Sequence, residues 1–77
     1  MKITYDSEAD ALYIELRKAA ATNSIDLEEG VAVDLDAEGH VIGIEVLDAS
    51  ERLTPDELKK LSYENLVLGK KAALSLP

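Results

Sequence analysis

The stretch 31-VAVDLDAEGHVIGIEVL-47 decides the fold, because apolar and polar side chains alternate along both of its halves. A period of two is typical of antiparallel strands that bury one face. Between the halves, Asp36-Ala37-Glu38-Gly39 predicts a tight acidic turn, with Gly39 in the left-handed conformation. The second half is apolar on both sides at its ends, so we expect it to lie in the middle of a sheet.

The same alternation extends toward the N-terminus. Ile3 and Tyr5 predict a short strand, residues 6–10 a turn, and residues 11–17 a second strand that completes a hairpin. On that second strand Leu12, Ile14 and Leu16 point one way, and Tyr13, Glu15 and Arg17 point the other. Residues 18–22 are expected to form a loop. Residues 24–27 alternate again, and Glu28-Glu29-Gly30 turns the chain into the stretch quoted above.

The period changes after residue 50. Thr54-Pro55-Asp56-Glu57 combines a threonine cap, a proline at the first helical position and a glutamate three residues after the cap. Leu53 and Leu58 have the spacing of a hydrophobic staple. These signals predict a short helix over about residues 55–61. The apolar tail after it, residues 62–77, can form a last strand, a helical turn or a frayed end.

These elements predict an α+β fold, a small and mostly antiparallel β-meander of four to five strands with one short C-terminal helix. We expect residues 1–77 to form a single domain, with the sheet in residues 2–50 and the helix and tail in residues 51–77. The chain has 77 residues, no cysteine and no phenylalanine or tryptophan, so its core is thin and lacks disulfides. Domains of this size often gain stability by self-association.

Charge narrows the classes of function. The net charge is −8, and residues 1–57 carry 15 acidic and 4 basic side chains. An acidic body repels phosphate backbones, so we expect no nucleic-acid binding. No apolar run approaches the length of a membrane span, and no leader is indicated. We therefore expect a soluble, cytoplasmic protein without membrane contact.

One motif has the spacing of a metal site. Asp34, Asp36, Glu38, Gly39 and Glu45 fall at the first, third, fifth, sixth and twelfth positions of a calcium loop. An EF-hand needs flanking helices, whereas these flanks alternate as strands, so we expect no metal. His40 is the single histidine, and the serines lack a nucleophile elbow. We therefore expect neither catalysis nor a cofactor.

Three blocks of sequence carry a resemblance to a known family. They are Tyr5–Ile14 (YDSEADALYI), Gly30–Asp36 (GVAVDLD) and Val41–Ser50 (VIGIEVLDAS). In their order and spacing they resemble the small prokaryotic domain of unknown function 2283, and the likeness covers residues 2–50. The resemblance implies a compact sheet domain with no assigned activity, and some relatives look like partners of small toxin-like proteins. Within these blocks, Asp6 and Asp10 can satisfy the amides of the first turn, Tyr5 and Tyr13 can pair across the hairpin, and Gly43 permits a close approach.

We expect the protein to be a non-catalytic protein–protein interaction module. Self-association is expected, as a homodimer in which residues 62–77 cross the interface and Lys70 and Lys71 lie over the acidic hairpin. An antitoxin-like role toward a basic protein is a further expectation, with Tyr13, Glu15 and Arg17 as the candidate partner surface. The alternative is a weak acidic metal-binding or small-ligand-binding protein.

Overall fold

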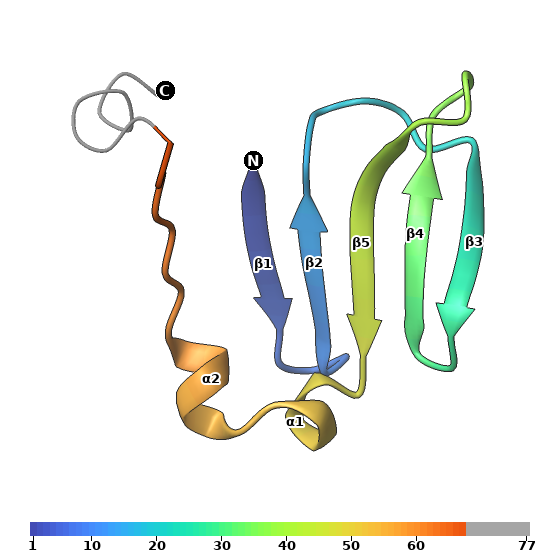
Figure 1. The fold of residues 1–77 in the computed structure, drawn as a ribbon. Helices are drawn as coiled ribbons and strands as arrows, with labels where there is room; N and C mark the ends of the chain where they lie inside the picture. Colours follow the sequence, from blue (N-terminus) through green and yellow to red (C-terminus); the bar gives the residue numbers. More distant parts are fainter. Residues whose placement is uncertain (68–77) are drawn as a thin grey trace.

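Five strands occupy the segments that alternate at period two. The computed structural model describes residues 1–67, which contain a five-stranded antiparallel sheet and two short helices (Figure 1). The strands are β1 (Lys2–Asp6), β2 (Ala11–Glu15), β3 (Asn23–Glu28), β4 (Val31–Leu35) and β5 (Val41–Leu47). The predicted α+β class is therefore confirmed, and residues 18–22 form the expected loop.

The order of the strands across the sheet is β1-β2-β5-β4-β3. β3, β4 and β5 form a meander, and β5 lies in the centre of the sheet, as its apolar ends predict. The chain does not continue the meander from β2 to β3, because β2 pairs with β5 instead. The loop after β2 consequently crosses to the far edge of the sheet (Figure 1).

The register separates an apolar face from a polar one. Ile14 lies between Ile3 on β1 and Ile44 on β5, and the row continues through Val33 to Ile25 on β3. This row of five aliphatic side chains crosses the whole sheet on one face. Since neighbours along a strand point to opposite faces, the intervening positions form the polar face.

One expected contact is wrong. Tyr5 lies opposite Leu12, whereas Tyr13 lies opposite Thr4, so the two tyrosines do not pair across the hairpin. A register that differs by one residue places the two rings on opposite faces. Tyr5 instead donates a hydrogen bond from its hydroxyl to Asp10 Oδ1 at 2.7 Å.

The turns follow the local sequence. Gly30 and Gly39 have φ of 86° and 85°, the left-handed conformation that side chains disfavour. Asp6 Oδ1 accepts the amides of Glu8 and Ala9 at 2.9 and 3.3 Å, so the first turn is closed by the aspartate that begins it.

The two helices are α1 (Ala49–Arg52) and α2 (Pro55–Lys59). The capping box of α2 is complete, because Thr54 Oγ1 accepts the Glu57 amide at 3.2 Å and Glu57 Oε1 accepts the Thr54 amide at 2.8 Å. α2 ends two residues before the expected Leu61. Helix α1, which the sequence pattern did not predict, is a single turn that begins at Ala49 and is separated from β5 by Asp48.

The described chain has few buried residues. Val33, Ile42 and Ala49 are its buried apolar residues, and no large side chain is fully buried. Residues 62–67 form neither helix nor strand, and the predictions for residues 68–77, including Lys70 and Lys71, lie outside the described residues. No helix within residues 1–67 has the length and apolar character that a membrane crossing requires.

Removing the cap of α2 tests whether this helix contributes to stability. Thr54→Ala should lower the free energy of unfolding by about 1 kcal/mol, because the Glu57 amide loses its acceptor. Urea titration measures the change, and Thr54→Ser is the matched control that keeps the hydroxyl. Equal stability of the alanine and serine variants would mean that α2 adds nothing to the fold.

Candidate functional site

Tyr13, the first residue of the predicted partner surface, makes an internal contact on the polar face. Its ring lies across Gly43, and its hydroxyl donates to Asp34 Oδ2 at 2.9 Å. A Cβ atom at position 43 would lie 1.9 Å from the Tyr13 oxygen, so the predicted close approach at this glycine is confirmed. Burial raises the pKa of Tyr13, and the hydrogen bond to Asp34 acts in the same direction. The ring thus links β2 to β4 across β5.

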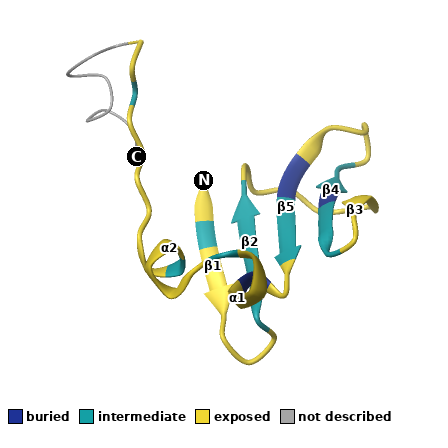
Figure 2. Ribbon diagram, turned by 60° about the horizontal axis from the view of Figure 1, so that its bottom comes forward, coloured by how far each residue is buried: buried dark blue, intermediate teal, exposed yellow. Residues whose placement is uncertain are grey.

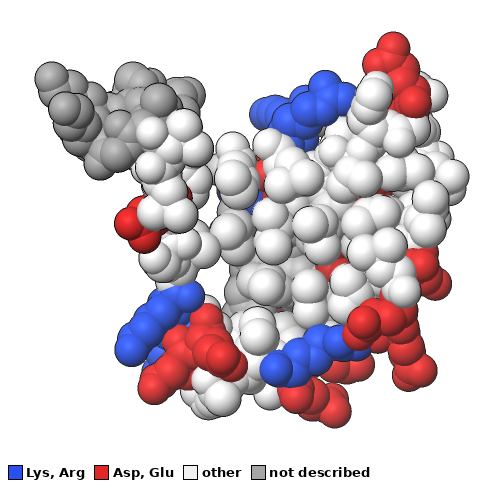
Figure 3. Space-filling model, in the orientation of Figure 1, with Lys and Arg blue, Asp and Glu red and all other residues white. Residues whose placement is uncertain are grey.

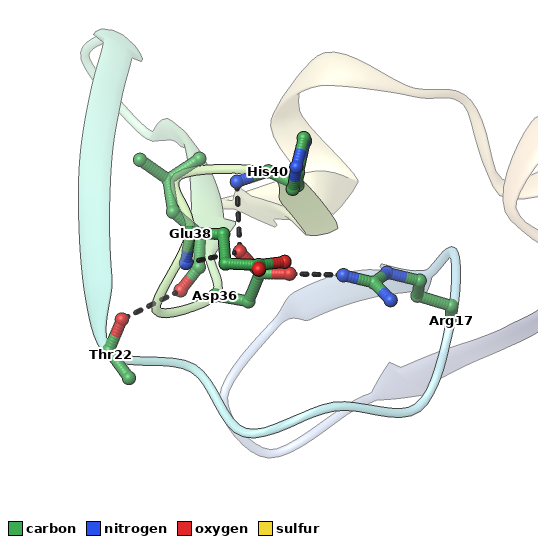
Figure 4. A network of polar contacts seen from close by, with 6 residues as sticks. Arg17, Thr22, Asp36, Glu38 and His40 are labelled. Atoms are coloured by element: carbon green, nitrogen blue, oxygen red, sulfur yellow. Dashed lines mark hydrogen bonds and ion pairs between the residues drawn. The ribbon is translucent and has the colours of Figure 1, made fainter.

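Arg17 and Asp36 form an ion pair at the other end of the same face (Figure 4). Asp36 Oδ1 accepts the amides of Glu38 and His40, each at 2.9 Å, and closes the turn between β4 and β5. These contacts lower the pKa of Asp36, the His40 amide most, and the Arg17 charge adds to the effect. The exposed His40 contributes its backbone here, and its side chain points away from the carboxylate.

Glu15 lies between these two contacts, half-buried on β2. The predicted surface of Tyr13, Glu15 and Arg17 therefore lies on one face, but two of its members hold the domain together. Its role in binding a partner stays a prediction.

The residues with calcium-loop spacing do not form a cage. Asp34 accepts the Tyr13 hydroxyl, and Asp36 accepts the amides of its own turn. Glu45 lies in the middle of β5, opposite Ala32 and Tyr13. Within residues 1–67, no three acidic or histidine side chains gather as metal ligands.

Arg52 organises an acidic notch at the end of the sheet where α1 lies. Its guanidinium donates to Glu28 Oε2 at 2.8 Å and to the Glu29 carbonyl, and its Nε donates to the Leu47 carbonyl at 3.3 Å. The notch is lined by Glu28, Glu29, Asp48, Glu51 and Arg52. The arginine joins α1 to the turn between β3 and β4, so this contact is structural.

A contact that the sequence pattern did not predict joins Asp10 to Ser50. The Asp10 carboxylate accepts the Ser50 hydroxyl at 2.6 Å and the Ser50 amide at 3.0 Å, and the Asp10 carbonyl accepts the Ala49 amide at 3.0 Å. Asp48, at the start of α1, makes no capping bond, so Asp10 caps this helix from 40 residues away. The Ser50 hydroxyl and then the Tyr5 hydroxyl hold the pKa of Asp10 below its ordinary value.

Part of the sheet's apolar face is exposed within residues 1–67. In this part of the chain, α2 and the residues around it lie over the β1–β2 side, where Leu53, Leu58 and Leu61 line a groove with Ile3, Leu12 and Ile14. Toward the other edge, Ile25 is 48% exposed and Leu27 is 63% exposed. Figure 2 shows every residue of β3 as exposed, and Figure 3 shows a broad uncharged surface over the strands with charges at its rim.

Residues 2–50 match the family described as protein of unknown function (DUF2283). An uncharacterized protein of Methanocaldococcus jannaschii is 36% identical over 67 residues, which are 87% of this chain and 55% of the relative. A Methanosarcina mazei protein named "Putative hypoxanthine phosphoribosyltransferase" is 33% identical over 64 residues, 80% of this chain and 51% of the relative. The chain thus spans about half the length of these relatives. No solved structure gives a significant match.

The pH dependence of stability should reveal the Asp10 contact. Because the folded-state pKa of Asp10 is lowered from 3.8, its contribution is fully present above pH 3.8 and is lost as the pH falls through the folded-state value. Asp10→Asn keeps a side chain that tolerates the φ of 52° at this position, but it removes the charge. We expect the variant to be less stable than the wild type at pH 7, and the difference to shrink in acid.

Urea titrations at pH 7 and in acid, below pH 3.8, measure the difference in the free energy of unfolding between the variant and the wild type. Asp48→Asn is the matched control, since Asp48 also has a positive φ, of 53°, and makes no capping bond. Equal effects of the two substitutions would contradict a special role for Asp10.

The acidic turn should not bind calcium. Since Asp34 and Asp36 are engaged and Glu45 is remote from the turn, millimolar calcium should leave the melting temperature unchanged at constant ionic strength. A thermal melt followed by circular dichroism, with magnesium as the control cation, tests this. A melting temperature that rises with calcium alone would contradict the structural reading.

Proposed function

This chain belongs to the DUF2283 family of proteins of unknown function, and we propose that it is a non-catalytic protein–protein interaction module that self-associates through the sheet's apolar face. The observation that carries the proposal is the aliphatic row from Ile3 to Ile25, over whose β4–β3 half no helix or strand of residues 1–67 forms a second layer. A sheet that is apolar on one face needs a covering layer. In this chain α2 is too short to provide it.

The open edge of β3 is a less suitable binding surface than the face. Asn23 Oδ1 accepts the Ser24 amide at 2.8 Å, and the register shifts between Asp26 and Glu28. Self-capped amides, bulges and charges are features that discourage strand addition at an edge. Binding through the face is therefore favoured over lengthening of the sheet.

The acidic body supports a further partner class. Because residues 1–57 carry 15 acidic and 4 basic side chains, a basic protein fits the polar side of the domain, in the manner of an antitoxin. The phosphoribosyltransferase name belongs to a relative of which this chain spans about half, and in the sequence the four glycines are too dispersed to match a phosphate-binding motif. We therefore retain an interaction role over a catalytic one.

Sedimentation at micromolar concentration tests self-association. The wild type should show a mass of about twice the 8.3 kDa of one chain. Ile25→Lys should shift it toward the monomer, because a charge then enters the apolar face. Ser24→Lys is the matched control, with the same charge change on the neighbouring residue of the polar face. A wild-type mass near 8.3 kDa at all concentrations would refute self-association.

A further inference from the structure

We infer that the layer over the apolar face comes from a second copy of this chain, whose residues 59–67 lie against β3 of the first. This inference rests on the proposed function and specifies the arrangement of the two partners. Each copy contributes the same segment and receives the partner's, so that the contact is made twice around a two-fold axis.

Two apolar surfaces of one chain are exposed and lie at opposite edges of the sheet. One is the edge at β3, where Ile25 and Leu27 are exposed. The other is the segment after α2, in which Leu61, Tyr63, Leu66 and Val67 are 73%, 59%, 78% and 92% exposed. Figures 1 and 2 show this segment beside β1, beyond the opposite edge from β3.

Within one chain these two surfaces are too far apart to cover each other. β1 and β3 are the outer strands of the sheet, and four strand spacings separate them by about 19 Å. The five residues of α2 do not span that width, since a helix rises about 1.5 Å per residue. A second copy can satisfy both surfaces at once.

Charge indicates how the second copy is oriented. Lys59 lies in the last turn of α2 and Lys60 is its C-cap residue, so the end of this helix is positively charged. The β3–β4 turn, with Glu28 and Glu29, lies at the same end of the sheet but on the opposite side (Figures 1 and 3). Because the lysines at the end of α2 and the glutamates of the β3–β4 turn lie at the same end of the strands, they attract each other across a dimer in which β1 of one copy faces β3 of the other.

A two-fold axis along the strand direction produces this exchange. It places the two apolar faces against each other, as in an aligned sandwich, and brings β1 of one copy opposite β3 of the other. Lys59 and Lys60 of each copy then lie over the β3–β4 turn of the second copy, and residues 61–67 run beside Ile25 of that copy. A two-fold axis perpendicular to the strands would instead place the β3–β4 turn of one copy and the lysines of the other at opposite ends of the strands.

Charge reversal in the full-length chain tests the arrangement. Lys60→Glu should weaken the dimer about tenfold at low salt, because two symmetric contacts become repulsive together. Combining Lys60→Glu with Glu29→Lys in the same chain should restore the affinity, since each exchanged residue meets its partner across the axis. We choose Glu29 because the Glu28 carboxylate is already paired with Arg52.

Lys18→Glu is the matched control. It makes the same change of net charge in the loop between β2 and β3, at the end of the sheet remote from α2 (Figure 1). This variant should keep the wild-type dissociation constant within about twofold. The apolar half of the contact is tested by Leu66→Ser, which should weaken the dimer by at least about tenfold.

Sedimentation velocity over a concentration series measures all four variants beside the wild type. A wild type that stays monomeric refutes the proposed self-association and this arrangement with it. If the wild type dimerises but Lys60→Glu and Lys18→Glu raise its dissociation constant equally, the arrangement alone is refuted. The same holds if adding Glu29→Lys to Lys60→Glu does not restore the wild-type affinity. A dissociation constant that Leu66→Ser leaves unchanged would also refute the arrangement but not self-association.

Discussion

The contact of Asp10 with Ser50 is the constraint on which the rest of the architecture depends. It joins the turn between β1 and β2 to the first turn of α1, and its carboxylate accepts both the Ser50 amide and the Ser50 hydroxyl. Without Asp10 the first amides of α1 would have no partner in a helix of four residues. Because α1 is held beside the β1–β2 turn, the chain continues to α2 on the β1 side of the sheet (Figure 1). Residues 1–67 consequently leave the opposite half of the apolar face uncovered, with Ile25 48% exposed.

This contact gives the family blocks a physical meaning. Asp10 is the last residue of the turn in the first block, and Ser50 is the last residue of the third block. The region that matches the family, residues 2–50, therefore contains both partners of the contact. The middle of the family region is held by Tyr13, which crosses Gly43 to reach Asp34. Within the region that matches the family, these residues therefore stabilise the sheet and its first helix.

The two faces of the sheet differ in what they leave unsatisfied. On the polar face, Tyr13 and Arg17 find carboxylates on β4 and in the turn that follows it, so this face is internally bonded. On the apolar face, no second layer from residues 1–67 covers β3, and Ile25 stays 48% exposed. Burial of such side chains is the main source of stability in small domains, which is why the proposed second layer belongs on this face.

Local sequence patterns predict the strands, the turns and the start of α2. Alternation, the glycines at positions 30 and 39, and the box between Thr54 and Glu57 act between residues close in the chain, so their signals are local. Only the tertiary structure decided that β2 pairs with β5 and that α1 exists. It also decided that the two tyrosines of the first hairpin lie on opposite faces. The pairing of β2 with β5 and the capping of α1 depend on contacts between residues far apart in the chain, as between Asp10 and Ser50, which are 40 residues apart. The two tyrosines lie on opposite faces because of the register of the β1–β2 hairpin. Register and strand order are not encoded in a local pattern.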